Sequence, residues 1–199
     1  MYKTLIIVLF LLCFSKTSFA QNSIEIKGGL TYLLNKEYYT SNNGLNLSVS
    51  YYPLTYKRFE LGLGIGYNSK GKFYNYLPHG YSSIRSESPV EFLELSLPAK
   101  TYFNLTKGVD VYLLLAGRYD IILTTYDRFF RSIAESSIFN STLGISAGIG
   151  FQFTWLYPNL LLEVSINPDL TYMAEENIKN TSLELKTGIL FNGFKSVDK

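Results

Sequence analysis

The stretch FELGLGIGY, residues 59 to 67, combines two features that conflict in an ordinary strand. Large apolar residues occupy its odd positions, and glycines occupy positions 62, 64 and 66. The alternation predicts a β-strand with one apolar face. Glycine weakens a strand, because it costs backbone entropy and contributes no side chain to pack. The glycines on one face and the apolar residues on the other must therefore be explained by the surroundings of the two faces.

The same alternation recurs along most of the chain, and no later segment has a sustained helical period. It predicts an all-β protein with eight strands, at 23–33, 45–52, 59–69, 91–103, 109–123, 142–153, 159–170 and 181–191. The segment 109–123 departs from the pattern, because Tyr112, Leu114 and Ala116 make both of its faces apolar.

The lengths of the connections alternate between long and short. They contain 11, 6, 21, 5, 18, 5 and 10 residues, in chain order. In an up-and-down antiparallel sheet, alternate connections lie at the same end, so all the short ones would fall together. Outer-membrane barrels have this asymmetry, with an even number of strands, short turns at one end and longer loops at the other.

Alternation alone does not say whether the apolar faces point into a core or outward. If they pointed inward, the exterior of strands 59–69 and 142–153 would be glycine-rich and nearly uncharged, which is a poor surface in water. If they point outward into lipid, the glycines open space inside a narrow lumen for long polar side chains of neighbouring strands. We therefore predict an eight-stranded antiparallel up-and-down transmembrane β-barrel.

Charged residues on the glycine-bearing faces are the candidates for filling this lumen. Six are acidic and four are basic, so they can largely pair, as buried charges must. The predicted lumen network is Glu25, Lys27, Glu60, Glu94, Lys100, Arg118, Asp120, Glu163, Glu184 and Lys186.

Aromatic residues cluster near both ends of the predicted strands, as expected for the two interfaces of a membrane. At the short-turn ends they are Tyr51, Tyr52, Tyr102, Phe103, Phe153, Trp155, Tyr157 and Phe191, and near the long loops Tyr32, Tyr67, Tyr119, Tyr126 and Tyr172.

The first 20 residues have the features of a cleaved secretory signal peptide. Lys3 precedes an apolar run at 5–14, and small residues at 18 and 20 suit cleavage before Gln21. The mature chain would then comprise a barrel domain at 21–191 and a short tail at 192–199. Cleavage removes the single cysteine, Cys13. It also removes two lysines, so the 18 basic and 16 acidic residues of the full chain become 16 of each. The resulting charge predicts no nucleic-acid partner.

Three segments, at 91–103, 143–153 and 180–191, resemble the outer-membrane β-barrel domain family of the Bacteroidota, often called PorT-like. Residues 91–103 (EFLELSLPAKTYF) resemble a strand of that family, and the glycine-rich residues 143–153 resemble the strand that follows its Gly-Pro-Tyr. Residues 180–191 (NTSLELKTGILF) resemble its last strand. Two positions depart from the family pattern: Arg118 replaces the proline, and Val164-Ser165 stand where members often carry Arg-Tyr.

The resemblance implies an integral barrel of the bacterial outer membrane, and some members of the family assist secretion. We expect a non-enzymatic protein whose long loops serve binding, or support secretion or envelope assembly. The expected partners are outer-membrane lipid including lipopolysaccharide, the barrel-assembly machinery during insertion, and an envelope or secretion protein. No cofactor and no metal site is expected, because the sequence carries no recognisable ligand cluster.

The candidates for binding lie in the long connections. They are Lys70, Lys72, His79, Arg85, Arg128, Phe129, Phe130 and Arg131. Lys70, Lys72 and Arg85 could pair with lipid phosphates. His79 with a loop serine leaves open a second function, a lipid-modifying hydrolase or acyltransferase. A soluble lipocalin-like periplasmic carrier is the third alternative.

Overall fold

The computed structural model of the protein describes residues 22–34, 39–41, 43–74, 87–123, 141–171 and 179–192. Nine strands lie in this part of the chain. They are β1 (Ser23–Leu33), β2 (Tyr39–Ser41), β3 (Asn43–Tyr56), β4 (Phe59–Tyr74), β5 (Glu87–Thr106), β6 (Val109–Ile122), β7 (Thr142–Phe153), β8 (Asn159–Pro168) and β9 (Thr181–Asn192). None of the described residues forms a helix long and apolar enough to cross a membrane.

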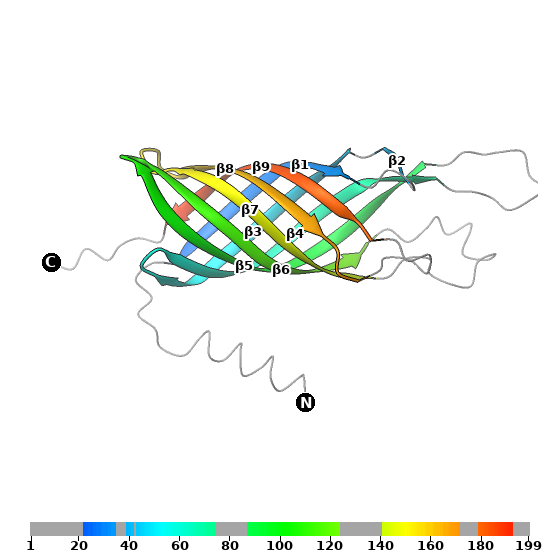
Figure 1. The fold of residues 1–199 in the computed structure, drawn as a ribbon, viewed down its shortest axis with the longest axis horizontal. Helices are drawn as coiled ribbons and strands as arrows, with labels where there is room; N and C mark the ends of the chain where they lie inside the picture. Colours follow the sequence, from blue (N-terminus) through cyan, green and yellow to red (C-terminus); the bar gives the residue numbers. More distant parts are fainter. Residues whose placement is uncertain are drawn as a thin grey trace, which may run out of the picture.

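Eight of these strands close into an antiparallel barrel (Figure 1). Each wall strand pairs with the next wall strand along the chain, and β1 pairs with β9 to close the barrel. The β4–β5 pairing joins strands separated by the longest predicted connection. The short β2 pairs only with the far end of β4 and is not part of the wall. The predicted eight-stranded up-and-down barrel is thus confirmed.

The two ends of the barrel differ as the connection lengths predicted. The turns β3–β4, β5–β6 and β7–β8 lie together at one end, the left-hand end in Figure 1. Two of these turns place a residue at positive φ, Lys57 at 54° and Gly108 at 92°. Glycine adopts that conformation without steric cost, which suits Gly108 to a tight reversal.

Strands β4 and β5 are longer than predicted at their long-loop ends. The prediction ended the first at Ser69 and began the second at Glu91, whereas pairing continues to Tyr74 and Glu87. A register shift lies between Ser69 and Lys72. This irregularity and the proline at 89 interrupt the alternation, so the sequence pattern faded before the strands did.

The apolar faces point outward and the polar faces point inward. Leu45 and Leu115 are 62% and 61% exposed, whereas Glu25 and Lys100 are fully buried. The inward face of β4 carries Glu60 and the three glycines of the stretch at 59–67. The orientation inferred from the glycines is therefore the observed one.

Strand β6 has an apolar stretch on its inner face as well as its outer one. Tyr112, Leu114 and Ala116 all face the lumen and are buried. Tyr112 and Leu114 join Leu161 and Leu190 in a small internal apolar cluster. The lumen therefore contains an apolar layer among its charges, which explains why both faces of segment 109–123 are apolar.

The aromatic residues only partly form external rings. Trp155 and Tyr157 in the β7–β8 turn are 69% and 72% exposed, and Tyr119 is exposed near the opposite end. Tyr52 is fully buried and Tyr102 is partly buried, because both face the lumen and hydrogen-bond to carboxylates there. Assigning these two tyrosines to an external ring was wrong. Tyr126 and Tyr172 lie outside the described residues.

A charge on the outer face tests the assigned orientation. Ile149 on β7 is 45% exposed and lies on the apolar outer face of the barrel, which we call the apolar belt. If hydrocarbon covers this face, Ile149→Arg should lower the free energy of unfolding by about 2–4 kcal/mol. The matched control, Gln152→Arg, places the same charge on the inner face of β7 and should cost much less. Unfolding in lipid vesicles with denaturant would measure both, and equal costs would contradict the orientation.

Candidate functional site

The lumen is the candidate site, because most of the charged side chains that the structure describes point into it and many of them pair with each other. Successive residues of a strand point to opposite faces, so Glu25 and Lys27 of β1 both point inward. The same alternation aims Arg118 and Asp120 of β6 inward, along with Glu184 and Lys186 of β9. Barrel closure then brings charges from distant parts of the chain into contact.

A first group of charges, the short-turn cluster, comprises Glu25, Lys27, Lys100 and Glu163. Lys27 Nζ lies 2.8 Å from Glu25 Oε1 and 2.7 Å from Glu163 Oε2. Lys100 Nζ donates to the other carboxylate oxygen of Glu25. Two cations thus face two anions, and none of the four side chains is more than slightly exposed.

Three tyrosines surround the short-turn cluster. Tyr112 donates to Glu163 Oε2 over 2.9 Å, and Tyr52 donates to Glu25 Oε1 over 3.4 Å. The ammonium of Lys100 also lies 4.3 Å from the ring centre of Tyr112 and 5.0 Å from that of Tyr52. Such contacts stabilise a cation that has lost its water. Tyr102 donates to Glu60 over 2.8 Å, closer to the end of the barrel.

A second group, the long-loop cluster, comprises Lys70, Arg118, Asp120 and Asp169. Arg118 Nη1 lies 2.7 Å from Asp120 Oδ2, and Arg118 Nη2 pairs with Asp169. Lys70 pairs with Asp120 and lies 3.5 Å from Asp169. This group is again two cations against two anions, and the Lys70 ammonium lies 4.6 Å from the ring centre of Phe92.

A polar chain lies between the two clusters. Lys186 Nζ is 2.5 Å from Glu184 Oε2, and Asn68 donates to Glu184 Oε1 over 2.7 Å. Asn68 in turn accepts from Thr31 over 3.0 Å. Glu94 of β5 lies on the same inner face and is partly exposed. The lumen is therefore filled along its length by ion pairs and hydrogen bonds.

Several inward-facing glycines lie next to the large side chains that fill the lumen. A Cβ at Gly144 would come within 2.6 Å of the Arg118 guanidinium, and one at Gly62 within 2.7 Å of the Tyr52 ring. A Cβ at Gly150 would overlap the Tyr112 ring. The glycine faces of β4 and β7 thus provide the volume that the arginine and tyrosine side chains occupy.

The ten side chains predicted for the lumen lie on the inner face of the barrel wall. Nine of them are buried, and Glu94 is partly exposed. Sequence reasoning missed Asp169, Asn68 and the three tyrosines. Asn68 and Asp169 were already on the inner faces of the predicted strands 59–69 and 159–170, so the same alternation could have found both, although β8 itself ends at Pro168.

Lys70 requires a correction, because it was assigned to a loop as a candidate for lipid phosphates. Strand β4 continues past Ser69, so Lys70 faces the lumen, where it is fully buried and paired with Asp120. The remaining loop candidates, His79, Arg85, Arg128, Phe129, Phe130 and Arg131, lie outside the described residues, as does the side chain of Lys72.

Chemically, the lumen holds its charges in mutual neutralisation rather than presenting them to a substrate. Each carboxylate of the two clusters contacts at least one cation, which lowers its capacity to act as a base. No group of three or more acidic, histidine or cysteine side chains among the described residues is placed to hold a metal ion.

Comparison with known proteins is informative at the level of fold. No protein-family model matches the chain, and no curated protein sequence matches it. The solved structure of a major outer membrane protein from Thermus thermophilus is 14% identical, with a TM-score of 0.51. The match covers 86% of this chain and 99% of that one. The chain has the fold of an outer-membrane β-barrel.

Two other solved structures are similar with lower scores. The N-terminal β-barrel domain of Pseudomonas aeruginosa OprF is 16% identical with a TM-score of 0.46, over 85% of this chain and 97% of that one. Ail, the attachment invasion locus protein of Yersinia pestis, in complex with a heparin analogue, is 18% identical with a TM-score of 0.44, over 86% and 98%.

Removal of one cation from the short-turn cluster tests whether the pairs hold the barrel together. Lys100→Met leaves Glu25 and Glu163 with Lys27 alone, and breaking a buried pair in this way costs about 3–5 kcal/mol. The control Lys107→Met changes an exposed lysine of the β5–β6 turn and should stay within about 0.5 kcal/mol. Denaturant unfolding in detergent micelles measures both, and a Lys100 variant as stable as the control would show that the cluster is dispensable.

Proposed function

We propose that this protein is an integral, non-enzymatic β-barrel of the bacterial outer membrane, whose long loops bind a partner or support secretion or envelope assembly. One observation carries the proposal: an apolar exterior surrounds a lumen filled with ion pairs. A soluble carrier would need the opposite arrangement, with apolar side chains lining its interior.

The dimensions and hydrogen bonding of the wall suit a bilayer. A strand crossing a membrane needs roughly 9–11 residues. The wall strands contain 10 to 20 residues, β8 being the shortest and β5 the longest. Closure pairs each wall strand on both sides, which leaves no open edge in the hydrocarbon. The exposed leucines and isoleucines of the wall strands then face lipid tails.

The filled lumen favours a supporting or binding role over a wide diffusion pore. In a barrel of this size, side chains fill the interior. The two clusters and the polar chain between them occupy successive levels of the lumen. We therefore place binding on the long loops, where the residues at 75–86 and 124–140 supply the candidate cations and aromatic side chains.

Membership of the PorT-like Bacteroidota family is part of this proposal and rests on the sequence motifs. The segments that carry the resemblance fall mainly within β5, β7 and β9. The proposal also includes export through a cleaved signal peptide at 1–20 and insertion by the barrel-assembly machinery. Lipopolysaccharide and an envelope or secretion protein are the partners proposed on the outer side.

A lipid-modifying enzyme remains the alternative from a different class of function. It would require His79 and a serine such as Ser82 to lie together at the membrane surface, with an acid to orient the histidine. The described residues include no histidine, and the carboxylates of the two lumen clusters pair with lysine and arginine.

Localisation tests the proposal directly. Expressed in a Gram-negative host, the protein should sediment with outer-membrane vesicles and resist extraction by alkaline carbonate. It should also migrate faster on a detergent gel when unboiled than when boiled, since a closed barrel stays compact in detergent. Recovery in the soluble periplasmic fraction, with no shift on heating, would contradict a membrane barrel and favour the lipocalin-like carrier.

A further inference from the structure

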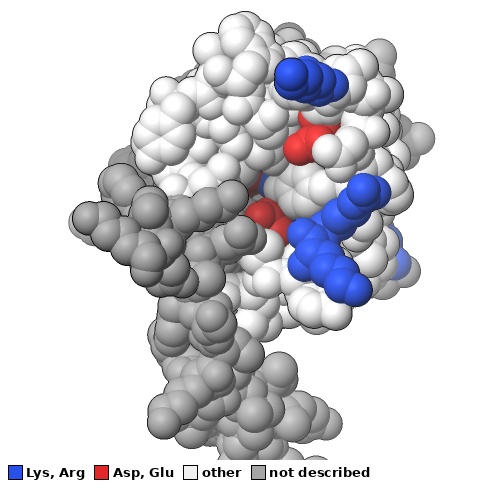
Figure 2. Space-filling model, turned by 90° about the vertical axis from the view of Figure 1, so that its left-hand side faces the viewer, with Lys and Arg blue, Asp and Glu red and all other residues white. Residues whose placement is uncertain are grey.

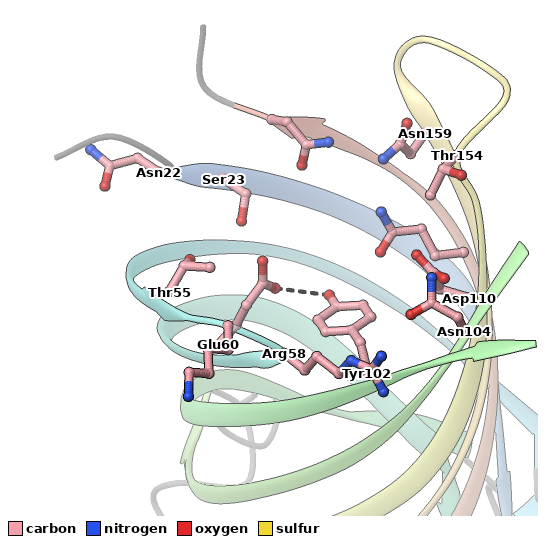
Figure 3. A pocket seen from close by; sticks show the side chains of 13 residues that line it. Asn22, Ser23, Thr55, Arg58, Glu60, Tyr102, Asn104, Asp110, Thr154 and Asn159 are labelled. Atoms are coloured by element: carbon pink, nitrogen blue, oxygen red, sulfur yellow. Dashed lines mark hydrogen bonds between the residues drawn. The ribbon is translucent and has the colours of Figure 1, made fainter. Parts of the chain in front are cut away.

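The short-turn end of the barrel contains a cavity of about 400 Å³. Viewed from that end, the molecule is hollowed, with acidic groups inside the hollow and basic groups around its rim (Figure 2). The side chains that line the cavity come from the ends of several wall strands and converge on one space (Figure 3). We call this space the short-turn mouth.

The wall of the short-turn mouth is polar. Five of its lining residues are carboxamides, and Ser23, Tyr102 and two threonines add hydroxyl groups. Its volume lies in the lower part of the range of ligand pockets, about 300–1,000 Å³, but those are mostly apolar. Gln152 is 6% exposed, and its Oε1 has no hydrogen-bond partner among the described residues. A buried acceptor without a partner in the described chain can accept a hydrogen bond from a ligand.

Charges of both signs line the mouth. Lys57 and Arg58 contribute cations from the β3–β4 turn, and Glu60 and Asp110 contribute carboxylates. None of the four forms an ion pair with another residue of the described chain, although Glu60 accepts from Tyr102 and Lys57 lies 5.2 Å from the ring centre of Tyr56. The deeper lumen differs, because its two clusters are internally neutralised.

We propose that the short-turn mouth binds a short zwitterionic peptide from the side of the membrane that the short turns face. Its ammonium group would pair with Glu60 or Asp110, and its carboxylate with Lys57 or Arg58. Each peptide group offers one donor and one acceptor, which is what a carboxamide side chain needs. A neutral sugar would leave all four charges unused, and a simple ion would use those of only one sign.

Calorimetric titration of the mature full-length barrel in detergent tests this site. The probe is tetra-alanine with free termini, and its matched control is the same peptide acetylated and amidated. We expect the free peptide to bind, and the capped peptide to bind at least about tenfold more weakly, because charge-assisted hydrogen bonds are lost. Glu60→Gln and Arg58→Gln should each reduce the affinity for the free peptide by about tenfold.

A third variant separates the mouth from general charge effects. Lys107 is exposed on the neighbouring β5–β6 turn and does not line the cavity, so Lys107→Gln should leave the affinity unchanged. Folding of every variant is checked by heat-dependent gel migration. Arg58 lies in an exposed turn, so its variant keeps the test valid if Glu60→Gln fails to fold.

Three results would overturn the proposal. They are the absence of binding, equal affinity for the free and capped peptides, and a Lys107→Gln effect as large as that of Arg58→Gln. A chain ending at Asn192, which lines the mouth, provides one more comparison. If tetra-alanine bound only to this shortened chain, the protein's own residues 193–199 would be the occupant, and the proposal of an external peptide would be wrong.

Discussion

Mutual neutralisation of charges inside a narrow barrel is the interaction on which the structure depends. Moving a carboxylate or an ammonium group out of water costs several kcal/mol for each ion, and only close pairing with further hydrogen bonds offsets that cost. The pairs Lys27–Glu163 and Arg118–Asp169 each join residues far apart in the sequence. They form only when the barrel is closed in the correct register.

The ion pairs and the lipid-facing apolar belt therefore specify the same register. A slip of one residue between neighbouring strands would turn charged residues toward hydrocarbon and apolar residues toward the lumen. The glycines contribute to this specificity, because Gly144 and Gly62 leave room only where the Arg118 and Tyr52 side chains arrive. The apolar outer face, the paired charges inside and the space left by the glycines thus all require the same register of the strands.

Much of the fold was predictable, because alternation reports the strands and connection lengths report the topology. The charged residues of the lumen were also predictable, since Glu163 and Lys186 alternate with apolar neighbours on strands of clear period. It was not predictable which side chain fills the space next to each glycine, because the neighbouring side chain depends on the register between strands. Lys70 was misassigned because β4 continues through an irregularity, and Tyr102 because a tyrosine near an interface can face either way.

The two ends of the barrel would serve different purposes under this account. The long connections supply the proposed outward-facing partner surface, whereas the short-turn mouth presents charges without ion-pair partners in the described chain, together with carboxamides. The paired charges of the lumen separate these two regions. Under the two proposals, the protein would contact one partner on each side of the membrane.

The orientation of the wall is the central claim, and fluorescence quenching by brominated lipid tests it most directly. The only cysteine, Cys13, lies in the predicted signal peptide, so mature variants can carry one cysteine each. Ile145→Cys and Ser146→Cys place a fluorophore at adjacent positions of β7, on the outer and inner faces respectively. The account predicts strong quenching at position 145 and weak quenching at position 146. The reverse order, or equal quenching at both, would contradict a barrel with lipid outside and ion pairs within.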